Sequence, residues 1–377
     1  MNKIEIRKQF PYLDSNKIYF NHAAVSPLPK YIADKINSYI HERSVTEINN
    51  YKAGLEKTEN LKHQLSKLLN AQSERIAFTK SVTDSLNILA QGIDWKQGDR
   101  IILNDIEFPA NVYPFLNLKN KGIEIDFVKS NDGAISIVDI EKLITSKTKL
   151  LSISFVQFLS GFRADLKTIG ELCKKNNIIF CVDVIQGAGV APLDIKEMQI
   201  DFLAGGAHKW LMGLMGLGYL FVTEELQNRI EQKNAGWLSV EDEWNLLDYN
   251  LEYKKDASKF HTGTFSMIGI TALNASLEFF NSIGFEIIRN NILDNTEYFI
   301  SRLNEIGIKQ MLQDVKRNNL AGIVTFPINN AEVIFEKLAA KSIVGSLREG
   351  MIRFSPHFYN TKEEIDIVIN ELKTSLE

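Results

Sequence analysis

The chain has 377 residues, of which 45% are hydrophobic and 24% are charged, and its net charge is −4. This composition is ordinary for a globular protein with a large core, and the charge gives no reason to expect a nucleic-acid or membrane partner. Two cysteines are too few for a disulfide framework or a zinc site, so we expect a cytoplasmic protein without a bound metal. The first residues contain no apolar signal region, and no apolar run is long enough to span a membrane.

The first two thirds of the chain alternate between apolar runs and helical patterns. Helical spacing is clearest at 81–93 and 167–177. Continuous apolar strands between helices are typical of a mostly parallel sheet covered on both faces, which predicts an α/β fold for a large domain over residues 19–260. The predicted strands are 75–80, 99–105, 123–129, 149–158, 178–185 and 217–222.

From about residue 265 the pattern changes to α+β. Amphipathic helices are predicted at 269–284, 295–307 and 361–376, with strands at 321–328 and 350–357 between them. We expect residues 1–18 and 261–377 to form a smaller domain together.

Two polar residues follow a predicted buried strand at "CVDVIQGAG", residues 181–189. In an open α/β sheet, ligands bind beyond the carboxyl ends of the strands, which is where Asp183 and Gln186 are expected. A buried carboxylate needs a positive partner. Asp183 therefore predicts either a contact with a cationic ring nitrogen or, as an alternative, a helix cap or internal salt bridge.

A lysine lies among glycines and apolar residues in "GGAHKWLMG", residues 205–213. Partial burial lowers the pKa of a lysine and leaves more of it as the free amine, which can form a covalent bond to a carbonyl group. Lys209 is therefore a candidate catalytic residue, next to His208. The alternative is an ordinary surface lysine whose stem covers apolar surface.

Other segments could contribute to the same site. At "KSVTDS", residues 80–85, a strand gives way to a helix, whose free N–H groups and the Thr83 hydroxyl could bind a phosphate; a simple helix cap by Ser81 or Thr83 is the alternative. Phe108 follows another strand and could belong to the core or lie on a ring-shaped ligand. Arg353 could bind a carboxylate or pair with Glu349.

Together, these segments resemble the class V aminotransferase family of fold-type I enzymes that use pyridoxal 5'-phosphate (PLP). The resemblance runs in order through "IYFNHAAVSPLP", "FTKSVTDSLN", "EFPANVYPF", "VDVIQGAG", "GGAHKW", "KFHTGT" and "IRFSPHFYNT". The family includes cysteine desulfurases and isopenicillin N epimerase-like proteins. The resemblance implies a seven-stranded, mostly parallel sheet, PLP as cofactor, an amino acid as substrate, and a homodimer with active sites at its interface.

The resemblance also implies a role for each site residue. For the cofactor, Lys209 would form the covalent link, Asp183 would contact the ring nitrogen, Gln186 would contact the phenolic oxygen, and Phe108 would stack on the ring. Val82, Thr83 and His208 would contact the phosphate, and Thr264 would reach the phosphate bound by the neighbouring subunit. For the substrate, Arg353 would bind the α-carboxylate, and Asn21, His22 and Ala24 would border the pocket.

Departures from the family pattern restrict the expected reaction. Desulfurases have a histidine where this chain has Phe108, and they use a cysteine nucleophile in a region where this chain has none, because no cysteine follows Cys181. Gly206 stands where many relatives have a serine that contacts the phosphate. Gln157 lies near the position at which desulfurases have an asparagine. We therefore expect an aminotransferase and disfavour a persulfide-forming desulfurase. An amino-acid epimerase or racemase, a C–S or C–Se β-lyase and a non-catalytic PLP-binding protein are the alternatives.

Overall fold

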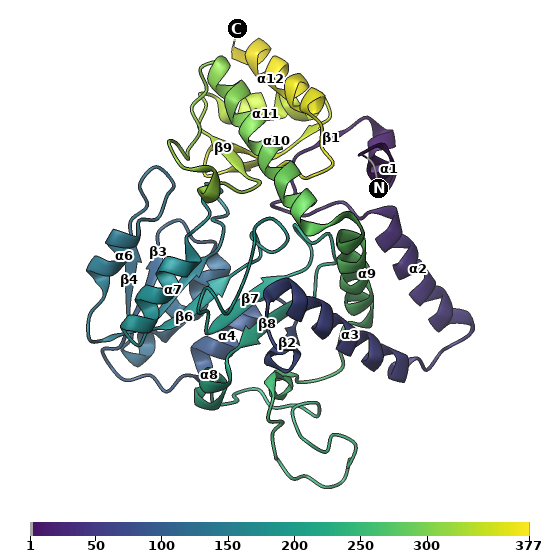
Figure 1. Ribbon diagram of the computed structural model, residues 1–377, viewed down its shortest axis with the longest axis vertical. Helices are drawn as coiled ribbons and strands as arrows, with labels where there is room; N and C mark the ends of the chain where they lie inside the picture. Colours follow the sequence, from purple (N-terminus) through teal and green to yellow (C-terminus); the bar gives the residue numbers. More distant parts are fainter. Residues whose placement is uncertain (1–2, 377) are drawn as a thin grey trace.

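The computed structural model describes residues 3–376, and its centre is a seven-stranded sheet in the order β2-β8-β7-β6-β5-β3-β4 (Figure 1). Neighbouring strands from β4 to β7 run parallel, whereas β8 is antiparallel to both β7 and β2. This arrangement confirms the predicted α/β fold with a mostly parallel sheet. The strands are β2 (Ile76–Thr79), β3 (Arg100–Asn104), β4 (Glu124–Val128), β5 (Thr148–Ser154), β6 (Ile179–Asp183), β7 (Phe202–Gly206) and β8 (Gly218–Val222).

Helices cover both faces of this sheet because its central strands are apolar on both sides. Every residue of β6, β7 and β8 is buried. Alternate residues of β6 enter different cores, with Phe180 on one face and Cys181 on the other. One face packs against α4 (Val82–Gly92), α5 (Tyr113–Leu116) and α8 (Glu224–Arg229), and the other against α3 (Tyr51–Leu69), α6 (Ile137–Leu143), α7 (Leu166–Lys175) and α9 (Met267–Ile283).

The C-terminal part builds a second, antiparallel sheet in the order β11-β12-β9. Its strands are β9 (Val324–Phe326), β11 (Ser346–Arg348) and β12 (Met351–Phe354), and its helices are α10 (Phe285–Glu305), α11 (Ala331–Ala340) and α12 (Lys362–Leu376). The N-terminal segment joins this part, because β1 (Ile18–Tyr19) pairs with β10 (Ile343–Val344). These elements form the upper part of the molecule in Figure 1. The expected domain boundary near residue 260 stays a prediction.

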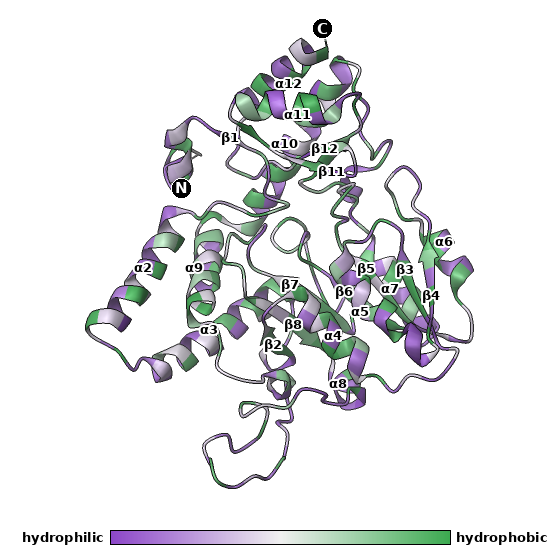
Figure 2. Cartoon of the chain, turned by 180° about the vertical axis from the view of Figure 1, so that it is seen from behind, coloured by the Kyte–Doolittle hydropathy of each residue, from purple (hydrophilic) through white to green (hydrophobic). Residues whose placement is uncertain are grey.

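The remaining helices are α1 (Lys3–Arg7) and α2 (Lys30–Val45), and α2 packs with α3 against α9. Hydropathy follows this architecture, since the strands of the large sheet are predominantly hydrophobic whereas the helices carry both kinds of residue (Figure 2). Within residues 3–376, no helix combines the length and the apolar character needed to cross a membrane.

Candidate active site

A cavity of about 340 Å³ lies at the carboxyl ends of the parallel strands. Its size falls within the range of small-molecule pockets, ~300–1,000 Å³. It collects nine of the residues singled out in the sequence, from both parts of the chain: Ala24, Val82, Thr83, Phe108, Asp183, Gln186, His208, Lys209 and Arg353. Asn21, His22 and Thr264 do not line it.

Asp183 ends β6 and is only 2% exposed. Its carboxylate accepts a hydrogen bond of 2.9 Å from the backbone N–H of Ile185, and within the described chain it has no ion-pair partner. Burial raises its pKa to about 7, whereas the Ile185 N–H and the Lys209 ammonium act in the opposite direction. The carboxylate neither caps a helix nor forms a salt bridge, so it is available to a cationic group in the cavity.

Lys209 lies in a tight turn that follows β7, and its side chain is 9% exposed. The turn is closed by hydrogen bonds from Met212 N–H to Lys209 O and from Gly213 N–H to Ala207 O. Gly205 must be small, because a Cβ atom there would lie 2.3 Å from the Tyr219 ring. Gly205 therefore leaves room for the Tyr219 ring of β8, and the turn directs Lys209 into the cavity.

The environment of Lys209 favours the free amine. Burial lowers its pKa to about 8; Asp183 raises it, and the charges of Arg353 and Arg348 lower it further. Its Nζ atom lies 5.5 Å from the centre of the Phe108 ring. Lys209 is thus a buried amine beside an aromatic ring and not a surface lysine.

The helix cap predicted at residues 80–85 is formed, and it leaves backbone donors free at the predicted phosphate site. Ser81 is the N-cap of α4, and its Oγ atom accepts a hydrogen bond of 3.1 Å from the Asp84 N–H. Val82 and Thr83 occupy the first two helical positions, whose N–H groups have no acceptor within a helix. The start of α4 therefore offers free donors and the positive end of a helix dipole to an anion.

Gln186 is held from two sides. Its Nε2 atom donates to Ala23 O at 2.9 Å, and its Oε1 atom accepts from the buried indole of Trp210 at 2.7 Å. One N–H of the side-chain amide remains for a ligand in the cavity.

Arg353 projects from β12 and is 2% exposed. Its Nε atom donates to Ser346 Oγ at 3.1 Å, and its Nη1 atom donates to Phe158 O at 2.7 Å. The alternative ion pair with Glu349 is not formed, and within residues 3–376 no carboxylate pairs with this guanidinium. Burial and the nearby Arg348 lower its pKa to about 10. Three of its five N–H groups remain for an anionic ligand.

Phe108 and His208 complete the lining around Lys209. The Phe108 ring is 44% exposed and packs edge to face on Phe158, with 5.2 Å between ring centres. Burial, together with the Lys209 charge, lowers the pKa of His208 to about 4, so that its imidazole is neutral near pH 7.

His22 and Asn21, which the resemblance placed at the border of the substrate pocket, do not line the cavity. His22 is fully buried; its Nδ1 atom donates to Ser355 O and its Nε2 atom accepts from the Tyr359 hydroxyl, both at 2.7 Å. Burial lowers its pKa to about 3. Asn21 forms a backbone bridge with Ser355. Both residues join the N-terminal segment to the end of β12.

Thr264 lines a neighbouring hollow of about 680 Å³. This hollow shares Lys80, Gly216 and Leu217 with the cavity around Lys209. Within one chain, Thr264 is therefore adjacent to the cavity and not part of its lining.

Glu107 does not line the cavity but supports the segment that carries Phe108, and the sequence reasoning missed it. It is 8% exposed and accepts hydrogen bonds from Asn104 Nδ2 at 2.6 Å, Ser154 N at 2.7 Å and Gln157 Nε2 at 2.9 Å. This network orients the segment that carries Phe108 and gives the fully buried Gln157 a structural role. The available signal was a carboxylate directly before Phe108, at the end of an apolar strand.

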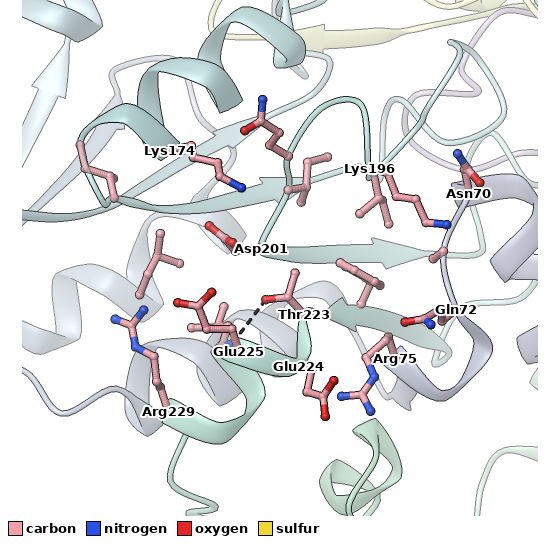
Figure 3. Close-up of a pocket in the computed structure, with 18 of the residues that line it drawn as sticks. Asn70, Gln72, Arg75, Lys174, Lys196, Asp201, Thr223, Glu224, Glu225 and Arg229 are labelled. Carbon is pink, nitrogen blue, oxygen red and sulfur yellow. Dashed lines mark hydrogen bonds between the residues drawn. The ribbon is translucent and has the colours of Figure 1, made fainter.

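Another hollow, of about 550 Å³, lies at the opposite ends of the strands of the large sheet (Figure 3). Figure 3 shows acidic and basic side chains around it, including Lys174, Asp201, Glu225 and Arg229. It lies at the amino ends of β6 and β7, whereas the general rule for α/β sheets places ligands beyond the carboxyl ends of the strands. The candidate active site is therefore the cavity around Lys209.

Comparison with known proteins identifies the family. The family description "Aminotransferase class-V" matches residues 18–368. The chain belongs to the class-V aminotransferase family. It is 28% identical to "Uncharacterized aminotransferase YcbU" of Bacillus subtilis over 98% of this chain and 96% of that protein. It is 30% identical to a "Probable cysteine desulfurase" of Borreliella burgdorferi over 98% of this chain and 95% of that protein.

A solved structure that contains PLP shares the fold. A mutant of C-DES with glycine covalently linked to its PLP cofactor superposes with a TM-score of 0.90, at 24% identity, over 97% of this chain and 98% of that one. The class-V family is PLP-dependent, and this chain is a class-V PLP enzyme.

The residues of the cavity fit PLP chemically. Asp183 is a buried carboxylate without a cationic partner within the described chain, Lys209 is a buried amine, and the start of α4 offers free N–H donors to a phosphate. Phe108 supplies an aromatic face next to the amine. Each polar group of the cofactor thus has a complementary group in the cavity.

The lowered pKa of Lys209 predicts how cofactor uptake depends on pH. The rate at which the apoprotein binds PLP covalently should rise with pH and level off above about 8, because only the free amine attacks the aldehyde. Replacing Arg353 by methionine removes a positive neighbour, so the midpoint should move to higher pH. Absorbance recorded during PLP addition over a range of pH measures both. A midpoint near 10.5, the ordinary lysine value, would contradict this account of the site.

Proposed function

We propose that the chain is an aminotransferase acting at Cα of an α-amino acid. The observation that carries this proposal is the meeting of Lys209, Asp183 and the unpaired guanidinium of Arg353 in one cavity. Arg353 supplies a buried bidentate donor for an α-carboxylate and thereby orients the Cα proton. PLP, when bound, accepts electron density from Cα.

The residues of the cavity would have the following roles in binding PLP and moving the Cα proton. Asp183 would bind the protonated ring nitrogen and hold its proton in place. Lys209 would hold the cofactor at rest and move a proton at Cα as general base or acid, a role typically worth ~10²–10⁴-fold in rate. Gln186 would donate its remaining N–H to the phenolic oxygen, and the N–H groups of Val82 and Thr83 would bind the phosphate, with neutral His208 beside them. Phe108 would supply an aromatic face to the ring.

The two cysteines support this proposal over a persulfide-forming desulfurase. Cys173 is 1% exposed and Cys181 is fully buried. Burial raises the pKa of Cys173 to about 12 and that of Cys181 further. Neither thiol is therefore a good nucleophile, and no other cysteine is present in the sequence. Two free thiols are also consistent with the cytoplasmic setting that we propose.

We also propose that the chain forms a homodimer with its active sites at the interface. Thr264 lies in a hollow that opens beside the cavity, where a second subunit could bring it to a phosphate. The long segment between α8 and α9, at the bottom of Figure 1, carries exposed apolar side chains that an interface would cover: Trp244, Leu246, Leu247, Tyr249 and Leu251.

Transamination has a direct test. The PLP-loaded protein is mixed with a panel of amino acids in the absence of a keto acid, and the absorbance spectrum and products are recorded. A good amino donor should convert the cofactor to its pyridoxamine form and release one keto acid per site. If no donor does so, transamination is excluded. Pyruvate release with loss of the side chain would indicate a β-lyase, and an inverted amino acid would indicate a racemase or epimerase.

A further inference from the structure

Positive charge exceeds negative charge among the residues that line the cavity. Lys80, Lys209, Arg348 and Arg353 line it, whereas Asp183 is its one carboxylate among the lining residues of the described chain. The proposed function uses most of these charges: Asp183 for the ring nitrogen, Lys209 for the covalent link and Arg353 for the α-carboxylate. Lys80 and Arg348 have no assigned ligand, and Arg348 is the one that lies on the strand paired with that of Arg353.

The geometry of a hairpin fixes where Arg348 lies. Arg348 ends β11 and pairs with Met351 of β12, and the intervening residues Glu349 and Gly350 have φ angles of 47° and 73°. Positive φ at both central residues is the tight hairpin turn that suits the twist of paired strands. Arg348 therefore projects from the end of a short, well-defined strand and not from an open loop.

The same hairpin places both arginines on one face. Side chains two residues apart on a strand point to the same side, so Arg348 shares the face of Ser346. Ser346 is paired with Arg353 across the hairpin, and its hydroxyl accepts the Arg353 Nε–H. The two guanidinium groups thus face the cavity from adjacent strands.

Arg348 is available for a ligand. Its one side-chain hydrogen bond in the described structure runs from Nη1 to Leu347 O, at 3.1 Å, and no carboxylate of residues 3–376 forms an ion pair with it. It is exposed at the cavity, whereas Arg353 is buried within it. Two arginines at different depths, neither neutralised by the protein, match a ligand with two separated anionic groups.

We propose that Arg348 binds an anionic group at the end of the substrate side chain, so that the preferred substrates are α-amino acids with acidic side chains. This inference rests on the proposed function, because it takes the α-carboxylate to be bound by Arg353. The two arginines also disfavour a basic side chain, which would be repelled by like charge.

Turnover of acidic amino acids and their isosteric amides tests the inference. The wild-type enzyme should use aspartate or glutamate with kcat/KM at least about tenfold above asparagine or glutamine, which corresponds to ~1.4 kcal/mol of discrimination. Arg348→Gln should bring this ratio close to one, mainly by raising KM for the acidic substrate. Arg348→Lys should retain part of the preference, because it keeps the charge but loses the bidentate geometry.

A matched control removes an arginine elsewhere. Arg43 lies on α2, and its Nη1 atom donates to the backbone carbonyl of Ile48, so Arg43→Gln changes the net charge without touching the cavity. It should leave the preference unchanged. The inference is overturned if wild type does not prefer the acidic substrates, or if Arg348→Gln keeps the wild-type ratio.

Binding of acids without an amino group separates this inference from the proposed function. Glutarate and butyrate, titrated calorimetrically into the PLP-loaded protein, do not react, so their affinities do not depend on which reaction follows. Glutarate should bind about tenfold more tightly than butyrate to wild type. Arg348→Gln should abolish this difference. Equal binding of both acids to wild type would refute the role of Arg348 even if transamination is observed. The expected difference in a protein that does not transaminate would refute the proposed function alone.

Discussion

Replacing Lys209 by alanine is expected to remove the covalent link to PLP and to lower kcat by more than ~10⁴-fold. Loss of a general base alone typically costs ~10²–10⁴-fold, and this change also removes the resting attachment of the cofactor. The buried amine is the residue that the tight turn after β7 directs into the cavity. Absorbance of the purified protein, and mass spectrometry after borohydride reduction, measure the link directly.

Lys80 provides the control for this experiment. It lines the same cavity but is exposed, and it directly follows β2. Lys80→Ala should retain the covalent link at Lys209. If reduction instead attaches the cofactor to Lys80, or if Lys209→Ala keeps the wild-type absorbance, the assignment of Lys209 is wrong.

Replacing Asp183 by asparagine should leave the covalent link in place while lowering kcat by about 10²–10³-fold, the typical cost of removing one preorganised electrostatic partner. The change keeps the shape of the side chain but removes the charge that holds the ring nitrogen protonated. Single-turnover kinetics with an amino donor, monitored by absorbance, measure the loss. A kcat within a few-fold of wild type would contradict the role of Asp183.

The same variant should make the apoprotein more stable. Burial raises the pKa of Asp183 from an ordinary value of 3.8 to about 7, so the folded chain binds this proton more tightly than the unfolded chain. The corresponding stability is present at low pH and is lost as pH rises through about 7. The amide of the Asp183→Asn variant does not titrate, so the melting temperature of the variant apoprotein should exceed that of wild type above pH 7. Equal melting temperatures of the two apoproteins above pH 7 would show that burial does not destabilise the Asp183 carboxylate.

Much of the fold followed from local sequence patterns. Continuous apolar runs such as β6 predict strands buried on both faces, and such strands require helices on both sides of a parallel sheet. The same runs locate the carboxyl ends at which Asp183, Phe108 and Lys209 meet. These predictions succeed because short-range periodicity reports burial directly.

Contacts across the chain were less predictable. His22 follows the N-terminal strand closely, but its hydrogen bonds to Ser355 and Tyr359 depend on tertiary packing, and the residue does not line the cavity. Glu107 and Arg348 were missed for a related reason. A charged residue beside a strand is usually a solvated surface residue, and only the folded arrangement reveals the donors around Glu107 or the cavity beside Arg348.

The pairing of β1 with β10, and of Asn21 with Ser355, has a consequence for synthesis on the ribosome. Cavity residues that are synthesised early, such as Ala24, are held in place by strands synthesised about three hundred residues later. Arg353 is also synthesised late. A nascent chain halted after β8 would contain Lys209 and Asp183 but would lack Arg353, the residue proposed to bind the α-carboxylate of the substrate. Competence for substrate should therefore appear abruptly, near the end of translation, and not grow in step with chain length.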